Sequence, residues 1–365
     1  MISAPILGAY ADHSGKHKEI LTFATISCAL ATLALSFCEQ GMVFYAAFFM
    51  IISNFSYSVH QDISAAYLVN ICDKKNLGRV SGFGWAWGFL GGIFTLLLCL
   101  TWISLVPNFH LHTVSSDQLG VSGSLIITAA IFAVVSLLSL SKLNKPLITK
   151  RNPNWSNVWK TFFLKIKKNE TLSRDLFNFL LCIFVYQSGI ATVITIAAIY
   201  AKEVMGFTIE QIILLILVVN ITAFFGAFVF GWVQDYLGHK KSLLIALWIW
   251  FLTTIIIFFA EDSWVFWLSA NLAGLAMGAS QSGARAAIAY LSPAGSQATN
   301  FGLWGFAINA ASIIGPFFYG LITLLTDNNH RVAILGVAVF FLLGIVLLLR
   351  CSFVVKIHEK NTTNF

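Results

Sequence analysis

Residues 231–241 read Gly-Trp-Val-Gln-Asp-Tyr-Leu-Gly-His-Lys-Lys, and residues 8–18 read Gly-Ala-Tyr-Ala-Asp-His-Ser-Gly-Lys-His-Lys. Both stretches have the spacing Gly-x3-Asp-x2-Gly followed by basic residues, at an offset of 223 positions. A shorter similarity pairs Phe83-Gly84 with Phe301-Gly302 at an offset of 218. Internal similarity at a nearly constant offset indicates a duplicated unit. The chain is therefore expected to consist of two related helix bundles.

The sequence around these loops is strongly apolar. Of its 365 residues 58% are hydrophobic and 10% are charged, and the mean hydropathy is +0.83, which excludes a water-soluble globular domain. The apolar runs lack the alternation of barrel strands, and backbone groups in lipid must be satisfied internally, so the runs are expected to be helices. The fold class is an all-α polytopic membrane protein. A short apolar stub covers 1–11, and ten full spans are expected at 20–37, 42–70, 80–106, 121–141, 176–201, 209–233, 242–260, 264–291, 300–325 and 332–355.

The charge distribution predicts the orientation in the membrane. The net charge is +7, but residues 142–174 alone hold nine Lys or Arg against Glu170, so the chain lacks the broad basic face that nucleic-acid binding needs. Cytoplasmic loops retain Lys and Arg. Alternate threading of the spans places 20 of the 22 basic residues on or near one side. Loop 12–19, the connection 142–174 and the C-terminal tail are therefore predicted to be cytoplasmic.

The basic connection also predicts the domain organisation: an N-terminal bundle at 1–141, a linker at 142–174, a C-terminal bundle at 175–356 and a tail at 357–365. Within the linker, five apolar residues recur at helical spacing. They are Trp155, Val158, Trp159, Phe162 and Ile166. With the neighbouring lysines they predict an amphipathic helix over 155–168 that lies on the lipid of the cytoplasmic leaflet; docking against the bundle ends is the alternative.

The paired loop motif resembles the signature of the major facilitator superfamily. Within it, the chain is similar to the vacuole-effluxer family associated with autophagy in fungi and widespread in bacteria. Further elements that carry the resemblance are Pro5-Ile6-Leu7-Gly8, Gly78-Arg79-Val80-Ser81-Gly82, Tyr186-x2-Gly189, Gly278-x2-Gln281-x3-Arg285 and Gly315-Pro316. The resemblance implies a twelve-helix, two-bundle transporter of small solutes, with amino-acid efflux the best-known activity. It implies the inner membrane for a bacterial protein and a vacuolar-type membrane for a fungal one.

The first motif copy begins much nearer to the start of its bundle than the second. Seven residues precede Gly8, whereas 56 residues of the second bundle, 175–230, precede Gly231. Within the resemblance, this predicts an N-terminally truncated chain that lacks helix 1 and most of helix 2.

The two aspartates of the motif are candidate gate residues. In a two-bundle transporter each would face the N-terminal end of a helix of the opposite bundle, where free N–H groups carry partial positive charge. We expect Asp235 near Gly82-Phe83 and Asp12 near Asn300-Phe301; a turn-forming role beside glycine is the alternative. The complete gating motif comprises Gly8, Asp12, Gly15, Lys16, Lys18, Gly231, Asp235, Gly238, Lys240 and Lys241.

Small residues predict closely packed helix faces. Gly84, Gly88 and Gly92 recur every four residues, as do Gly274, Gly278 and Ser282, and such faces let helix backbones approach one another in lipid. The contact is either static packing or a sliding surface. Gly315 and Pro316 predict a kink in the span 300–325.

Asp62 and Arg285 are the clearest charges within spans, and such charges usually face a cavity or a partner. Arg285 is expected to bind a substrate carboxylate or Asp62, with snorkelling to the interface as the alternative. Tyr186, Gln187 and Gln281 are further pathway candidates.

The expected function is secondary transport, by alternating access, of small polar solutes such as amino acids or related metabolites. Enzyme function is not expected, because the chain lacks G-x-x-x-x-G-K-[ST] and the clustered His, Glu and Asp of an intramembrane hydrolase. The six cysteines show neither C-x-x-C spacing nor neighbouring histidines, so no metal site or cofactor is expected. The partners are a solute and membrane lipid, and the sequence assigns no coupling ion. A non-transporting membrane sensor, or an inactive truncated remnant, is the alternative.

Overall fold

The computed structural model describes residues 3–106, 116–143, 174–293 and 295–353. Apolar helices dominate because each long run satisfies its own backbone hydrogen bonds. The first part contains α1 (Ser3–Ser14), α2 (His17–Leu35), α3 (Val43–Ala66), α4 (Leu68–Ile71), the 3-10 turn η1 (Lys74–Asn76), α5 (Leu77–Leu105) and α6 (Ser116–Lys142). The second contains α8 (Arg174–Glu203), α9 (Ile209–Leu237), α10 (His239–Phe259), α11 (Ser263–Leu291), α12 (Gln297–Leu325) and α13 (His330–Arg350).

Each of the ten predicted spans contains one long helix, and the helix of the last span, α13, ends at Arg350. Nine of the described helical segments are long and apolar enough to cross a membrane. The tenth predicted span, α11, has 29 residues but is rich in alanine, glycine and serine and mostly buried. Its moderate hydropathy fits a helix covered by protein rather than by lipid. The span expected at 42–70 corresponds to the candidate span Val43–Ile71, in which α3 and the short α4 are separated only at Tyr67.

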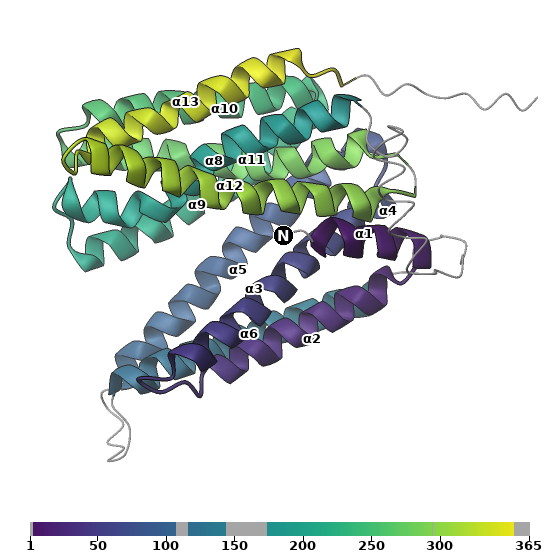
Figure 1. The fold of residues 1–365 in the computed structure, drawn as a ribbon, viewed down its shortest axis with the longest axis horizontal. Helices are drawn as coiled ribbons and strands as arrows, with labels where there is room; N and C mark the ends of the chain where they lie inside the picture. Colours follow the sequence, from purple (N-terminus) through teal and green to yellow (C-terminus); the bar gives the residue numbers. More distant parts are fainter. Residues whose placement is uncertain (1–2, 107–115, 144–173, 294, 354–365) are drawn as a thin grey trace, which may run out of the picture.

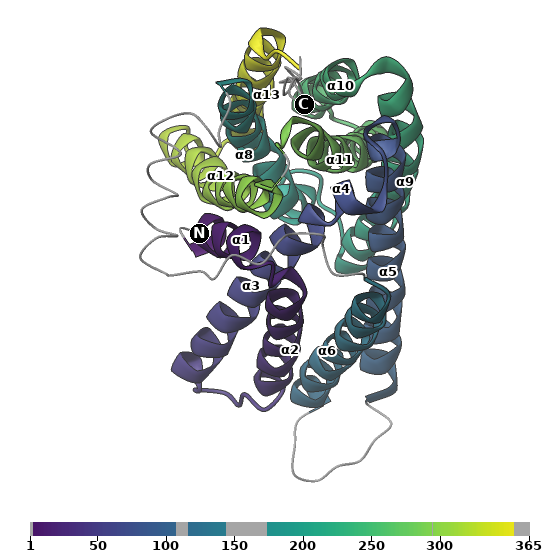
Figure 2. The ribbon, with the colours of Figure 1, turned by 90° about the vertical axis from the view of Figure 1, so that its right-hand side faces the viewer.

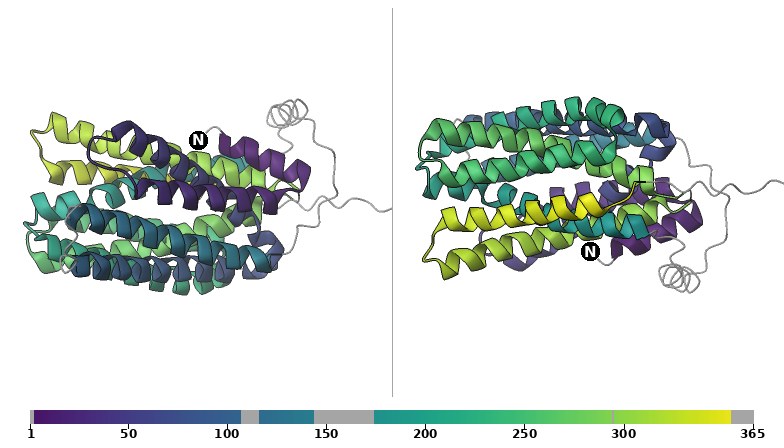
Figure 3. Two further views of the ribbon diagram at one scale, coloured as in Figure 1. Left: turned by 90° about the horizontal axis from the view of Figure 1, so that it is seen from below. Right: turned by 90° about the horizontal axis from the view of Figure 1, so that it is seen from above.

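The helices form two bundles that diverge from a shared end (Figures 1 and 2). The first bundle, α2, α3, α5 and α6, tilts away from the second, α8 to α13, and the two meet near α1 and α4 (Figure 1). Views from below and above show the helices of each bundle running side by side (Figure 3). The core of the second bundle includes the fully buried Trp250, which stacks on Phe341 with ring centroids 5.3 Å apart.

The described part of 1–141 contains four long helices, α2, α3, α5 and α6, together with the short α1, α4 and η1. The backbone of α1 runs directly along α12 of the other bundle: a Cβ on Gly302 would lie 2.5 Å from the carbonyl oxygen of Ala4. The amphipathic helix predicted for 155–168 and the predicted tail 357–365 lie outside the described residues.

Candidate functional site

Asp235, near the end of α9, binds the start of α5 in the other bundle. Its carboxylate accepts hydrogen bonds from the backbone N–H groups of Gly78 (2.8 Å) and Arg79 (3.0 Å). The Arg79 side chain adds an ion pair at 3.2 Å, and its guanidinium lies 4.2 Å from the ring centre of Trp232. The N-cap residue of α5, Asn76, makes no side-chain cap of its own. Asp235 therefore caps α5 from across the bundle interface.

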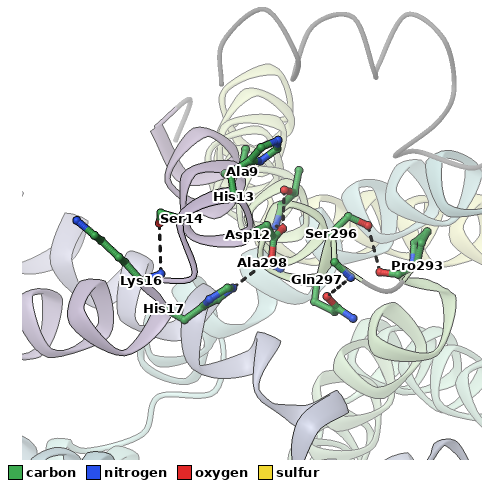
Figure 4. Close-up of polar contacts among 12 residues, drawn as sticks. Ala9, Asp12, His13, Ser14, Lys16, His17, Pro293, Ser296, Gln297 and Ala298 are labelled. Carbon is green, nitrogen blue, oxygen red and sulfur yellow. Dashed lines mark hydrogen bonds and ion pairs between the residues drawn. The ribbon is translucent and has the colours of Figure 1, made fainter. Parts of the chain in front are cut away.

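Asp12 makes the corresponding contact with α12 (Figure 4). Its carboxylate accepts from the backbone N–H groups of Ala298 (3.1 Å) and Thr299 (2.8 Å) and from the Thr299 hydroxyl (2.7 Å). It also pairs with His17 at 3.2 Å, and both side chains are buried. Ser296, the N-cap residue of α12, again provides no side-chain cap. Both candidate gate aspartates thus replace a missing helix cap.

The predicted contacts are present but lie nearer to the helix starts than expected. The sequence placed Asp235 at Gly82-Phe83, and the structure places it at Gly78 and Arg79. It placed Asp12 at Asn300-Phe301, and the contact is with Ala298 and Thr299. The reason is that the first N–H groups of a helix are the ones without internal partners, and these helices begin earlier than the apolar runs suggest.

The motif glycines permit these contacts. A Cβ on Gly8 would overlap the backbone of Ala298, and one on Gly82 would lie 2.5 Å from the Ala227 carbonyl oxygen and 2.8 Å from the Gly231 Cα. Gly15 and Gly238 have φ values of 67° and 87°, a region that L side chains rarely adopt. Glycine is therefore required both at the helix crossings and at the turns.

Two motif lysines cap helix ends, a role that the sequence analysis missed. Lys18 donates to the carbonyl of Leu143, just after α6, at 2.9 Å. Lys240 donates to the carbonyls of Leu349 and Cys351, at the end of α13, at 2.8 Å each. Cations suit the negative end of a helix. The side chains of Lys16 and Lys241 are exposed.

Arg285 joins α11 to α5 across the interface. Its Nε donates to the Ser81 hydroxyl at 3.0 Å and its Nη2 to the Ser81 carbonyl at 2.7 Å. Its guanidinium lies 5.7 Å from the ring centre of Trp85. The Ser81 hydroxyl in turn donates to the carbonyl of Ser282 at 2.7 Å. The predicted pairing with Asp62 is wrong for this arrangement, and so is snorkelling, because the guanidinium turns to the opposite bundle.

Asp62, on α3, is buried against a different helix. A Cβ on Gly305 of α12 would overlap both carboxylate oxygens, and Oδ2 makes no hydrogen bond within the described residues. One turn away, Asn309 donates to the Ser58 hydroxyl at 3.0 Å. Each intramembrane charge therefore contacts the opposite bundle, but the two charges contact different helices.

Tyr186 is a correction to the predicted pathway. Its ring is fully buried and packs on Gly344 of α13, inside the second bundle, so it belongs to the core. Gln187 is also buried, whereas Gln281 is half-buried one helical turn before Arg285. Of these three, only Gln281 shares the helix face of Arg285.

The predicted packing faces divide into two groups. Cβ atoms on Gly274 and Gly278 would overlap α9, one on Gly315 would overlap Ser188 of α8, and one on Gly84 would meet the Arg285 guanidinium. By contrast, nothing lies within 4 Å of a Cβ on Gly88 or Gly92. These two glycines are exposed and do not pack in this arrangement. Pro316 lies within the continuous helix α12.

The second bundle also contains a cavity of about 310 Å³ between α8, α9 and α11. Its lining is almost entirely apolar, with Asn220 the amide side chain among it and Trp250 in its wall. It lies in the halves of these helices remote from Asp235 and Arg285, and it is not lined by Asp62, Tyr186, Gln187, Gln281 or Arg285, the five pathway candidates named above. Sequence analysis missed it because apolar cavity walls and packed cores have the same composition.

Comparisons with known proteins place this chain in a family. A family model described as "Vacuole effluxer Atg22 like" matches residues 70–360. An uncharacterized MFS-type transporter YxiO of Bacillus subtilis is 24% identical over 94% of this chain and 79% of that protein. Autophagy-related protein 22 of Eremothecium gossypii is 22% identical over 87% of this chain and 66% of that protein.

Solved structures show the same fold. The major facilitator transporter FucP in its outward conformation superposes with a TM-score of 0.74 at 16% identity, covering 96% of this chain and 86% of that one. The human organic anion transporter MFSD10 gives a TM-score of 0.71 at 16% identity, covering 94% and 80%. The chain thus belongs to the Atg22-like vacuole effluxer family and is a multi-pass membrane transporter of the major facilitator superfamily.

Proposed function

We propose that this transporter moves amino acids or related small polar metabolites by alternating access, and that the arrangement described is closed on the side of the basic loops. The observation that carries the proposal is the pair of aspartates, Asp12 and Asp235, each capping a helix of the opposite bundle. Both contacts involve the first turn of a helix, α5 or α12, and the two bundles meet near α1 and α4 (Figure 1). The membership in an effluxer family supports a solute that leaves a compartment.

In this proposal the gate opens when both aspartates leave their helix ends. Each carboxylate accepts several charge-assisted hydrogen bonds, and each such bond contributes about 1.5–3 kcal/mol. The helix ends and the carboxylates are hydrated after separation, so the net cost of opening is a fraction of that sum. A bound solute can supply this free energy of opening through contacts that it makes only in the open arrangement.

Arg285 is the proposed group for a solute carboxylate. Its guanidinium uses Nε and Nη2 on Ser81, and these contacts must break when α11 separates from α5. A carboxylate then offers the same planar guanidinium a bidentate replacement. Arg285 therefore serves as a latch in the closed arrangement and as a ligand for the solute in the open one.

The test is transport of an amino-acid panel in proteoliposomes by the parent chain and by Arg285→Lys and Arg285→Ala. We expect both variants to reduce transport at least tenfold, because lysine lacks the planar fork of guanidinium. Lys202→Gln, an exposed residue on α8, is the matched control and should transport at the parent rate. Parent rates in both Arg285 variants would contradict the carboxylate role, and absence of transport by the folded parent chain for the whole panel would contradict the substrate class.

A further inference from the structure

A second hollow, of about 460 Å³, lies beside the Asp235 gate and gathers cations from both bundles. Lys74 and Lys75 reach it from η1 in the first bundle, and His239, Lys240 and Lys241 from the start of α10 in the second. Retention of lysines on the cytoplasmic side explains basic loops. It does not explain why lysines of two bundles converge on one hollow.

The positive charge of this hollow is not compensated by its own acidic residue. Asp235 lines the hollow, but its carboxylate is already bound to the Arg79 guanidinium and to two N–H groups of α5. Lys240 is held by two backbone carbonyls, which are neutral, and Lys74 lies 5.8 Å from the ring centre of Tyr290. Four ammonium groups therefore remain without an anionic partner among the residues that line the hollow.

The start of α10 adds to this positive potential. Its N-cap, Gly238, has no side chain to cap the helix, and the first turn contains two lysines and no acidic residue. That arrangement opposes the helix dipole, which favours anions at this end. The equivalent helix of the first repeat, α2, has Glu19 in its first turn. Only the second repeat lacks an anion at this place.

A buried amide provides an independent indication of a ligand. Gln234 lines the hollow and is 1% exposed. Its Nε2 donates to the Gly283 carbonyl at 2.9 Å and to His239 Nδ1 at 2.7 Å, which leaves His239 with its proton on Nε2 as a donor. The Gln234 Oε1 makes no hydrogen bond within the described residues. It is suited to accept from a hydroxyl of a bound group.

We propose that this hollow binds a phosphate-bearing anion that carries a hydroxyl, either P–OH or a polyol, and that the anion links the two bundles while the gate is closed. The lysines and the α10 N-terminus would hold phosphate oxygens, and Gln234 the hydroxyl. The source is a phosphorylated lipid headgroup or a soluble polyphosphate. This site is separate from the solute pathway, and its occupant stabilises the closed arrangement rather than being transported.

The experiment compares the full chain with Lys75→Gln/Lys241→Gln. The control, Lys142→Gln/Lys202→Gln, removes the same charge from exposed lysines outside the hollow. In one arm, tripolyphosphate is titrated by calorimetry into protein in neutral detergent. In the other, thermal unfolding is followed in nanodiscs of phosphatidylcholine with and without phosphatidylinositol 4-phosphate. Lys75→Arg/Lys241→Arg keeps the charge and reports on folding of the altered site.

We expect saturable binding that the glutamine pair weakens about tenfold or more, while the control pair and the arginine pair bind like the parent. Binding in the first arm identifies a soluble anion as sufficient, and a stabilisation seen only in the second identifies a lipid headgroup. Either result supports the site, and neither depends on solute transport. Equal behaviour of the glutamine pair and the control pair in both arms would overturn it.

Discussion

At the residue scale, the two gate aspartates combine charge with helix capping, and substitutions can separate these contributions. Asn caps a helix about as well as Asp, but it lacks the negative charge that the helix dipole and Arg79 attract. We expect Asp235→Asn to weaken closure moderately and Asp235→Ala to weaken it more, because alanine leaves the N–H groups of Gly78 and Arg79 without acceptors.

The readout is modification of a cysteine at the buried position Ala227, whose carbonyl lies against Gly82. A membrane-impermeant maleimide should label this cysteine most slowly in the parent, faster in Asp235→Asn and fastest in Asp235→Ala. Asp73→Ala, an exposed acid near the same end, should label like the parent. Equal labelling of all variants would refute the capping role of Asp235.

Asp62 leads to a second prediction at this scale. Its carboxylate is buried with one oxygen unpartnered, a costly state for a charge but not for a neutral group. We expect Asp62→Asn to preserve or raise the thermal midpoint, by about 2–4 °C for each kcal/mol gained.

If Asp62 carries a proton during transport, the same variant loses the pH dependence of transport, since an amide does not titrate. An unchanged pH profile would exclude Asp62 as that carrier, and a lower midpoint would show that its charge is stabilising.

At the element scale, alanine substitutions at two glycines of the predicted packing faces are expected to have different effects on thermal stability. A Cβ on Gly278 would overlap backbone atoms of Ala223 and Ala227 on α9, whereas one on Gly92 meets nothing within 4 Å. We expect Gly278→Ala to lower the thermal midpoint, since α9 and α11 must move apart. Gly92→Ala should leave it unchanged or add up to about 1 kcal/mol through helix propensity. Thermal unfolding in one detergent measures both, and equal effects would contradict the difference in packing.

The lengths of the apolar runs were sufficient to predict the ten long helices. In lipid, backbone N–H and C=O groups have no water to bond to, so an apolar run must satisfy them internally by forming a helix. The run lengths did not predict which residues a given side chain contacts. Arg285 and Asp62 could be recognised as intramembrane charges, but their contacts with Ser81 and Gly305 depend on how helices of different bundles cross. Tyr186 was expected in the pathway and is instead part of the core of the second bundle. The gate aspartates were predictable because the repeat relates each loop to a helix start in the other bundle.

At the scale of the whole molecule, the two gates are related by the internal repeat. Asp12 joins α1 to α12, and Asp235 joins α9 to α5, so each bundle provides one carboxylate and one uncapped helix. A relative rotation of the bundles must break both contacts together. Loss of both carboxylates should therefore shift the population of closed and open arrangements more than loss of either one.

The distance between the bundles on the side remote from the gates tests this account most directly. Spin labels on Glu39→Cys, between α2 and α3, and on Glu261→Cys, between α10 and α11, mark exposed loops of the two bundles at that end. The six natural cysteines are replaced by serine or alanine in all samples. We predict a long distance in the parent background and a second, shorter distance that appears in Asp12→Asn/Asp235→Asn. The same distance distribution in both proteins would contradict the assignment of these aspartates to the gate.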